Sequence, residues 1–304
     1  MNKKYLVTGG AGFIGSHTVS ALIDRGDEVV IVDNLVTGKR ENIHPRAGFY
    51  EMNITDPKIK EVFEKERPDY IYHFAFNVMV PESIANPLID MDSIAGSVNL
   101  LNNARKHGVK KVIFSSSGFV YGNTDKLPTK EDTPIESISS YVVSKNAVEN
   151  YLEFFYRAYQ LPYVVLRYGT VYGPGQVKGA MADYIRKLTA GEQATIWGDG
   201  LKTRDYVYID DIVTANLLAM DLNESHSPAI FNVGNGKETT LNEVYQLIAD
   251  LLGKYAQPMY LPERSGELMR NCLDSNKFQS VSNWTSQYLL KDGLKLRLKV
   301  EGLI

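Results

Sequence analysis

The chain has 304 residues, of which 44% are apolar and 23% charged, and 33 basic against 36 acidic residues give a formal net charge of −3. This length allows one large domain or two modest ones, each with a buried core. The absence of a long basic block argues against a nucleic-acid partner and against an anionic membrane surface. A single cysteine, Cys272, excludes an internal disulfide and indicates a reducing compartment.

The sequence contains no recognisable targeting or metal-binding pattern. The N-terminal apolar run is three residues long, too short for a signal peptide, and no stretch approaches the roughly 20 apolar residues that span a bilayer. The five histidines have neither partner cysteines nor metal-ligand spacing. We therefore expect a cytoplasmic protein without a metal site or a membrane segment.

Short apolar runs alternate with helical patterns over about the first 170 residues. Each run is bounded by Gly, Pro or Asp, as buried parallel strands are, and the runs lie at 4–9, 28–34, 48–54, 69–76, 111–117 and 162–168. The longest helices between them are predicted at about 87–107 and 141–159. This alternation predicts an α/β fold with a doubly wound, Rossmann-type parallel sheet.

The pattern changes after "YGPGQ" at 172–176. Glycines become denser, the apolar runs at 194–200 and 204–209 are short, and helices are predicted at about 210–222 and 241–252. We predict a smaller α/β substrate-binding domain that is interleaved with the first. The predicted division gives residues 1–169 to an NAD-binding domain, with segments near 206–233 returning to it, and residues 170–304 mainly to the substrate-binding domain.

A glycine motif follows the first predicted strand. In "YLVTGGAGFIGSH", Gly9, Gly12 and Gly15 allow a tight turn and a close approach of the backbone to a pyrophosphate at the helix N-terminus. Asp33 ends the next strand, where a carboxylate binds ribose hydroxyls and repels a 2′-phosphate, so NAD is favoured over NADP. The alternative is a glycine turn and a strand-end aspartate that bind no ligand.

A Tyr-Lys pair at the start of the helix at 141–159 follows a strand that ends in three serines. Tyr141 and Lys145 are four residues apart and therefore share one helix face. A phenol has a pKa of about 10, and a nearby cation lowers such a value by about 1–3 units. With Lys145 and the positive nicotinamide as cations, Tyr141 can take a proton from an alcohol whose oxygen a strand-end serine holds. The same spacing also occurs on ordinary surface helices, so its meaning depends on the motifs before it.

These motifs resemble the extended short-chain dehydrogenase/reductase family, in its NAD-dependent nucleotide-sugar epimerase/dehydratase branch. The resemblance runs along almost the whole chain and is carried by "TGGAGFIGSH", "KKVIFSSSG", "LPYVVLRYG", "KTRDYVYIDDI", "FNVGNG" and "RSGE". It implies 4-epimerisation of a nucleoside diphosphate sugar of the UDP-glucose/UDP-galactose type through a transient 4-keto intermediate. The alternatives are another nucleotide-sugar oxidoreductase or dehydratase of this branch and a non-catalytic dinucleotide-sensing module.

The resemblance also assigns roles to individual residues. Ser117 holds the reacting oxygen, Tyr141 is the base and Lys145 holds the cofactor ribose, while Ser115 and Ser116 serve packing and cofactor contacts. The implied cofactor-binding residues are Gly9, Gly12, Phe13, Ile14, Gly15, Asp33, Asn34, Asn53, Ile54, Phe74, Ala75, Tyr141 and Lys145. The implied substrate-binding residues are Ser117, Thr170, Arg204, Arg264, Glu267 and Asn271. Arginine forks suit a diphosphate, the alternative being surface ion pairs, and the acids at 205, 210 and 211 are expected to be structural, in a turn and at a helix N-cap.

The residues after Ser117 separate the reactions of this branch. Its 4,6-dehydratases carry an Asp-Glu pair there, because elimination of water needs an added acid and base, but this chain has Gly118 and Phe119. The prediction is therefore hydride removal, rotation of the 4-keto sugar and hydride return to its other face.

Several residues depart from the pattern of the branch. Phe76 stands where a small residue is common, Ser93 replaces an asparagine, and Thr170 after Gly169 replaces another asparagine that usually meets the diphosphate. Asn271 stands where glucose-restricted members have a tyrosine, and its smaller side chain would admit a 2-acetamido group.

The helix at 141–159 is apolar or aromatic on more than one face, whereas the helix of a monomer usually has one apolar stripe. We predict a homodimer in which this helix and the helix at 87–107 pack against their symmetry mates, as is common in this branch. The alternative is a helix buried on the sheet with partly exposed aromatic side chains.

Overall fold

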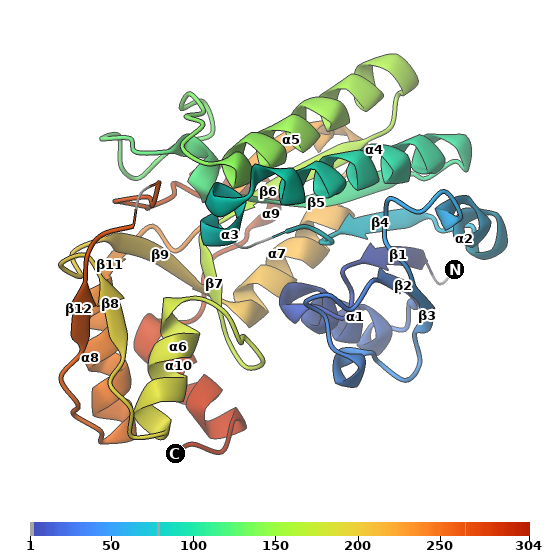
Figure 1. The fold of residues 1–304 in the computed structure, drawn as a ribbon. Helices are drawn as coiled ribbons and strands as arrows, with labels where there is room; N and C mark the ends of the chain where they lie inside the picture. The colour runs from blue at the N-terminus through green and yellow to red at the C-terminus, as the bar shows by residue number, and fades with distance from the viewer. Residues whose placement is uncertain (1–2, 78–79, 265) are drawn as a thin grey trace.

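A computed structural model describes residues 3–77, 80–264 and 266–304, and its centre is a seven-stranded parallel sheet (Figure 1). The strand order is β10-β6-β5-β4-β1-β2-β3, which confirms the predicted Rossmann-type α/β fold. The strands are β1 Lys4–Thr8, β2 Glu28–Asp33, β3 Gly48–Glu51, β4 Tyr70–His73, β5 Lys111–Ser117, β6 Tyr163–Tyr168 and β10 Ala229–Val233. Their apolar runs are continuous because helices cover both faces of the sheet.

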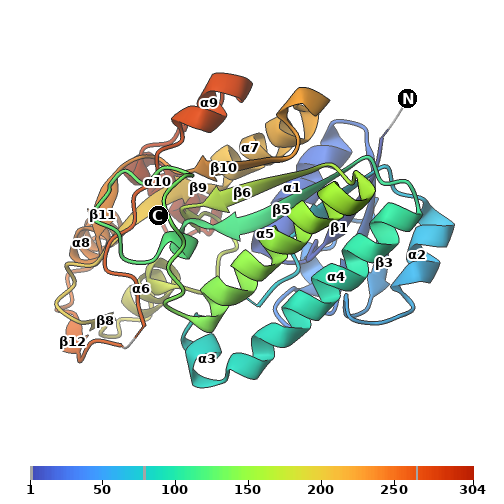
Figure 2. The ribbon, with the colours of Figure 1, turned by 90° about the horizontal axis from the view of Figure 1, so that it is seen from above.

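Two hydrophobic cores lie on the two faces of the sheet. Helices α1 (Phe13–Asp24), α7 (Ile209–Asp221) and α9 (Asn276–Ser282) pack on one face. Helices α2 (Ile59–Glu66), α4 (Met91–Lys106) and α5 (Ser140–Tyr159) pack on the other. Figure 2 shows α4 and α5 running side by side over the sheet. Helix α7 and strand β10 therefore return to the large sheet from the second half of the chain.

A third core lies beside the C-terminal ends of the central strands, at the left of Figure 1. A mixed sheet has the order β11-β9-β7, from Glu238–Thr240, Thr203–Tyr208 and Thr170–Tyr172, and β8 (Thr195–Trp197) pairs with β12 (Met259–Leu261). Helices α6 (Ala180–Thr189), α8 (Leu241–Leu252) and α10 (Leu290–Val300) pack around these strands. The assignment of this region as a substrate-binding domain stays a prediction.

The helix predicted at about 87–107 is divided in two. A 3₁₀ turn, η2 (Pro87–Asp90), begins at a proline, and the Asn86 side chain accepts a hydrogen bond from the Leu88 backbone at 3.3 Å. Helix α4 then runs on from Met91. The short helix α3 (Val80–Ala85) precedes this pair, and the other 3₁₀ turns are η1 Arg40–Asn42, η3 Gly118–Tyr121 and η4 Glu224–His226.

The roles predicted for three aspartates need correction in detail. Strand β9 runs directly into α7, so Tyr208 is the N-cap and Asp210 and Asp211 lie in the first helical turn. The Asp211 carboxylate instead accepts hydrogen bonds from the segment at 286–288. Asp205 lies in β9 rather than in a turn, and its buried carboxylate accepts three backbone N–H bonds. Burial raises the pKa of Asp205 to about 6.

Candidate active site

The glycine turn joins β1 to α1. Gly9 has a φ of +71°, and a Cβ there would lie 2.6 Å from the backbone nitrogen of Ala75. A Cβ at Gly15 would lie 2.1 Å from the Gly9 carbonyl oxygen. Gly12 is the N-cap of α1, so no capping side chain and no acidic residue of the first turn occupy the positive end of this helix. A helix end of this kind suits an anion such as a pyrophosphate.

Asp33 lies at the end of β2 beside this turn and is 6% exposed. One carboxylate oxygen accepts a hydrogen bond from the Ala11 backbone at 3.0 Å and the other from the Leu35 backbone at 2.9 Å. A carboxylate has about four acceptor sites, so two bonds leave capacity for ribose hydroxyls. The amide oxygens of Asn34 and Asn53 each accept a backbone N–H two residues further on.

The turn after β4 is fixed by a buried hydrogen-bond chain. The Thr8 hydroxyl lies 2.7 Å from His73 Nδ1, and His73 Nε2 lies 2.7 Å from the Ser97 hydroxyl. The backbone N–H groups of Phe74 and Ala75 donate to the carbonyl and the hydroxyl of Thr8. Burial, with the nearby Lys145 charge, lowers the pKa of His73 to about 3, so this imidazole is neutral. Ile54 packs nearby, against Gly96 of α4.

The three serines at the end of β5 have different partners. The Ser115 hydroxyl donates to the His73 carbonyl at 3.3 Å, and the Ser116 hydroxyl donates to Glu149, which forms a buried ion pair with Arg167. Ser117 is less buried, its hydroxyl accepts a hydrogen bond from the Phe119 backbone at 3.2 Å, and it lies close enough to Tyr141 to lower the pKa of that phenol. The first two hydroxyls therefore serve packing, and the third faces the phenol.

Helix α5 places both Tyr141 and Lys145 beside the end of β5. Ser139 caps this helix by accepting a hydrogen bond from the Val142 backbone, which fixes Tyr141 in the first turn. The Lys145 ammonium donates to the Ser115 carbonyl at 2.7 Å and lies 5.8 Å from the centroid of the Tyr141 ring. It also lies 3.7 Å from the ring centroid of Phe76, one of the residues that depart from the branch pattern.

The electrostatics of this pair differ from the expectation that Lys145 lowers the pKa of the phenol. Burial raises the pKa of Tyr141 to about 12, the nearby Ser117 hydroxyl lowers it, and the Asp90 charge raises it. Burial also lowers the pKa of Lys145 to about 7, against the opposing charges of Glu149 and Asp90. Both groups are desolvated, and this disfavours the charged form of each.

A pocket of about 360 Å³ lies between α3, the start of α5 and residues 264 and 266–268. Arg204 lines it, and one of its nitrogens donates to the carbonyls of Thr203 and Leu268 at 2.7 and 2.8 Å. Arg264 lies 3.7 Å from the centroid of the Trp197 ring. Glu267 also lines the pocket and is held by the Lys202 ammonium at 2.7 Å. Two guanidinium groups therefore reach one apolar-walled pocket.

Thr170 and Asn271 carry unsatisfied polar atoms. Within the described ranges, the Thr170 hydroxyl and the Asn271 amide oxygen are the two buried side-chain polar atoms that lack a hydrogen-bond partner. The Asn271 amide nitrogen lies 3.4 Å from the Gly118 carbonyl. An unsatisfied buried polar group costs about 1–3 kcal/mol, so a ligand that pairs with these atoms would relieve that cost.

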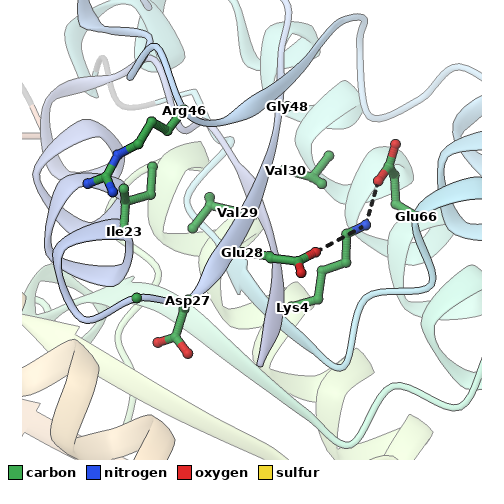
Figure 3. Close-up of a pocket in the computed structure, with 10 residues that line it drawn as sticks. Lys4, Ile23, Asp27, Glu28, Val29, Val30, Arg46, Gly48 and Glu66 are labelled. Atoms are coloured by element: carbon green, nitrogen blue, oxygen red, sulfur yellow. Dashed lines mark ion pairs between the residues drawn. The ribbon is translucent and has the colours of Figure 1, made fainter. Parts of the chain in front are cut away.

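A second pocket, of about 270 Å³, lies at the N-terminal ends of the strands β1, β2 and β3 (Figure 3). Its lysine, Lys4, is 2.7 Å from Glu66 and 3.7 Å from Glu28, so its charge is already matched. Ligands of doubly wound sheets bind at the carboxyl ends of the strands, which lie at the opposite end of the strands from this pocket. We assign no chemistry to this pocket.

Four residues around the site were not predicted from the sequence. Trp197 directly precedes the "GDG" stretch at 198–200, and Lys202 is the first residue of "KTRD". Their places next to these motifs could have indicated them. Glu149 follows Lys145 by one helical turn, a spacing that places it on the same face. No sequence pattern indicated a role for Asp90, because its hydrogen-bond partners come from separate segments of the chain.

The fold and these side chains together define an enzyme class. A Rossmann-type sheet with a glycine turn and a strand-end carboxylate is typical of enzymes that bind a dinucleotide, and a serine, a tyrosine and a lysine are grouped at the carboxyl ends of its strands. The model of the NAD dependent epimerase/dehydratase family matches residues 5–234, and the chain belongs to this family.

The chain is also similar to several proteins that are named as 4-epimerases of UDP-sugars. The chain is 36% identical over 300 residues to a UDP-glucose 4-epimerase of Mycolicibacterium smegmatis, with 95% of each chain covered. A UDP-glucose 4-epimerase of Thermotoga maritima, solved with UDP-glucose, superposes with a TM-score of 0.95 at 42% identity over 98% of both chains. A UDP-N-acetylglucosamine 4-epimerase of Methanobrevibacter ruminantium gives a TM-score of 0.90 at 34% identity over 98% of this chain and 97% of that one.

Two further observations concern the described residues alone. No helix among them is long and apolar enough to cross a membrane. No group of three or more of their His, Cys, Asp and Glu side chains is arranged to hold a metal ion.

Proposed function

We propose that the chain catalyses NAD-dependent 4-epimerisation of a nucleoside diphosphate sugar of the UDP-glucose or UDP-N-acetylglucosamine type. The observation that carries this proposal is the grouping of Ser117, Tyr141 and Lys145 with no carboxylate at the two following positions, Gly118 and Phe119. Elimination of water would need an added acid and base, so the same observation disfavours a dehydratase.

The dinucleotide edge of the sheet fits NAD. The proposed contacts are the uncapped N-terminus of α1 for the pyrophosphate, Asp33 for the adenosine ribose and Lys145 for the nicotinamide ribose. The ammonium has three donors, and one is used by the Ser115 carbonyl. Bound NAD supplies the chemistry of accepting a hydride from the sugar and returning it.

Tyr141 and Ser117 handle the proton of the 4-hydroxyl in this proposal. Ser117 holds the oxygen, and the Tyr141 phenolate takes its proton when the 4-keto sugar forms and returns it afterwards. Since the pKa of Tyr141 is about 12 in the protein alone, the positive charge near the bound cofactor has to lower it. Inversion then requires that the 4-keto sugar presents its other face within the pocket.

The other pocket residues are proposed to hold the nucleotide sugar. Arg204 and Arg264 suit the diphosphate, because guanidinium forks pair well with phosphate oxygens. Thr170 and Asn271 have unpaired buried oxygens, which supports polar contacts with a ligand. Glu267 is proposed to bind the nucleotide ribose, and the short Asn271 side chain supports tolerance of a 2-acetamido group.

The test is conversion of separate sugars without added cofactor. Purified protein is incubated with UDP-glucose, UDP-N-acetylglucosamine and UDP-glucuronate, and the C4 configuration is followed by proton NMR. We expect interconversion of at least one sugar, and loss of that activity in Tyr141→Phe, which keeps the ring but removes the hydroxyl. Conversion that persists in this variant, or no conversion of any of the three, contradicts the proposal.

We also propose that the protein acts as a cytoplasmic homodimer. The single cysteine, Cys272, is buried and unpaired, which supports a reducing compartment. An exposed apolar face of α5 supports self-association, with the second copy packed on this face.

A further inference from the structure

We infer that Asp90 is a positioning residue for the proposed reaction, because its carboxylate ties the turn after β4 and helix α3 to the first turn of α5 and sets a fixed negative charge near Tyr141. The inference rests on the proposed function, in which Tyr141 is the base. Asp90 itself contacts neither substrate nor cofactor in this account.

The Asp90 carboxylate is 2% exposed and collects donors from three segments. One oxygen accepts a hydrogen bond from the Asn77 amide nitrogen at 2.8 Å. The other accepts hydrogen bonds from the hydroxyls of Ser83 and Ser140, which lie 2.7 Å from each other. Hydrogen bonds to an ionised acceptor are roughly twice as strong as neutral ones, so this cluster is a firm junction.

The junction joins the pocket wall to the catalytic helix. Ser83 lies in α3, and the side chains of α3 residues line the pocket of about 360 Å³. Ser140 is the first residue of α5 and directly precedes Tyr141. A shift of about 1 Å in a reacting group can reduce a rate about 100-fold, so a junction at this point controls the geometry of the phenol.

The charge of Asp90 also acts on the reacting groups. Around the Tyr141 phenol lie the Ser117 hydroxyl from β5, the Lys145 ammonium from α5 and Asp90 from η2. Asp90 raises the pKa of both Tyr141 and Lys145. The buried acid of α5, Glu149, is paired with Arg167, and its charge also acts on Lys145. Asp90 therefore opposes formation of the phenolate and favours the charged lysine.

The principal variant is Asp90→Asn, with Asp92→Asn as its matched control. The asparagine can still accept from Asn77 and donate to the two serine hydroxyls, so the fold should persist. Asp92 is an exposed residue two positions away, and its variant removes the same charge. We expect Asp90→Asn to lower the plateau kcat about tenfold and to move the acid limb of the kcat–pH profile to lower pH. Asp92→Asn should match the parent enzyme.

A second readout needs no turnover. With 3,5-difluorotyrosine at position 141, whose phenol titrates at a lower pH than that of tyrosine, ¹⁹F NMR follows this one group. The pKa should be lower in Asp90→Asn than in the parent and unchanged in Asp92→Asn. This titration can be measured even if no sugar is epimerised, so a failure of the proposed function and a failure of this inference remain distinguishable.

The variant Ser140→Ala tests the positioning of Tyr141 without removing the charge of Asp90. It also provides a test of the inference if Asp90→Asn does not fold. It breaks one bond of the junction and keeps the carboxylate, so kcat should fall while the titration of position 141 stays in place. The inference is overturned if the titration is the same in Asp90→Asn and the parent. It is also overturned if Ser140→Ala retains full kcat.

Discussion

At the scale of single residues, the neighbours of the proposed base, Tyr141, act on its pKa in opposite directions. The Ser117 hydroxyl lowers the pKa of Tyr141, whereas burial and the Asp90 charge raise it. Tyr141 must lose its proton to act as a base, so kcat should rise with pH as the phenol ionises. A neighbour that lowers this pKa extends activity to lower pH, and a neighbour that raises it does the opposite.

Replacement of Ser117 by alanine is predicted to move the acid limb of the kcat–pH profile to higher pH, opposite to the shift in Asp90→Asn. The plateau kcat should fall about 100-fold, as for loss of a hydrogen-bond donor to a reacting oxygen. The control is Ser116→Ala, whose hydroxyl faces Glu149. It should leave the limb in place and lower the free energy of unfolding by about 1 kcal/mol. An unshifted limb in Ser117→Ala would contradict the predicted role.

At the scale of elements, α5 has two apolar faces. One packs on the sheet through Val148, Leu152 and Phe155. The other is exposed, with Val143 at 48%, Tyr151 at 39% and Phe154 at 49% of their accessible areas. Helix α5 itself lies next to α4, on the outside of the molecule (Figure 2). A continuous exposed apolar stripe of this kind is typical of an interface.

The variant Phe154→Glu is predicted to convert the proposed homodimer to a monomer, because it would bury two unpaired carboxylates at a twofold interface. Light scattering after size exclusion measures the mass directly. Val300→Glu makes a comparable change at another exposed position, 69% accessible at the end of α10, and should leave the mass unchanged. A wild-type protein that is monomeric at all concentrations would contradict the dimer.

The elements that sequence reasoning predicted best are those whose pattern is local. The central strands form apolar runs because both faces are covered, and the long helices have clear periodicity. The runs at 48–54 and 69–76 end earlier as strands, at Glu51 and His73, and the residues that follow His73 contact Gly9 of the glycine turn. Helix α7, at Ile209–Asp221, lies within one residue of its predicted range, but its N-cap was wrong because β9 enters the helix without a loop.

In the candidate site, too, the residues with a local sequence pattern were predicted, and those brought together by tertiary packing were not. Ser117, Tyr141 and Lys145 are found by motif, since each lies at a fixed place in a strand end or a helical turn. The Asp90 junction could not be predicted, because Asn77, Ser83 and Ser140 meet it only through tertiary packing. The pKa of Tyr141 was also out of reach, because the depth of burial that sets it is not a local property of the sequence.

At the scale of the whole molecule, the two parts of the chain are joined around the site. Helix α7 and β10 return to the large sheet after β9, and β9 carries Arg204 toward the end of β5. The central strands therefore end opposite the pocket residues of the smaller sheet. A fold of this kind serves several reactions, so the proposed reaction rests on the side chains of the site and not on the fold.

The most direct test of the central claim uses a UDP-sugar with deuterium at C4, chosen from those that the protein converts. If the same hydride leaves and returns, both epimers keep the deuterium at C4, and none enters the solvent. This result is predicted without added cofactor, because the oxidation is reversed within each turnover. Deuterium that moves to C6 would indicate a dehydratase, and deuterium that is transferred to added cofactor would indicate a net oxidoreductase. Either result would contradict the account.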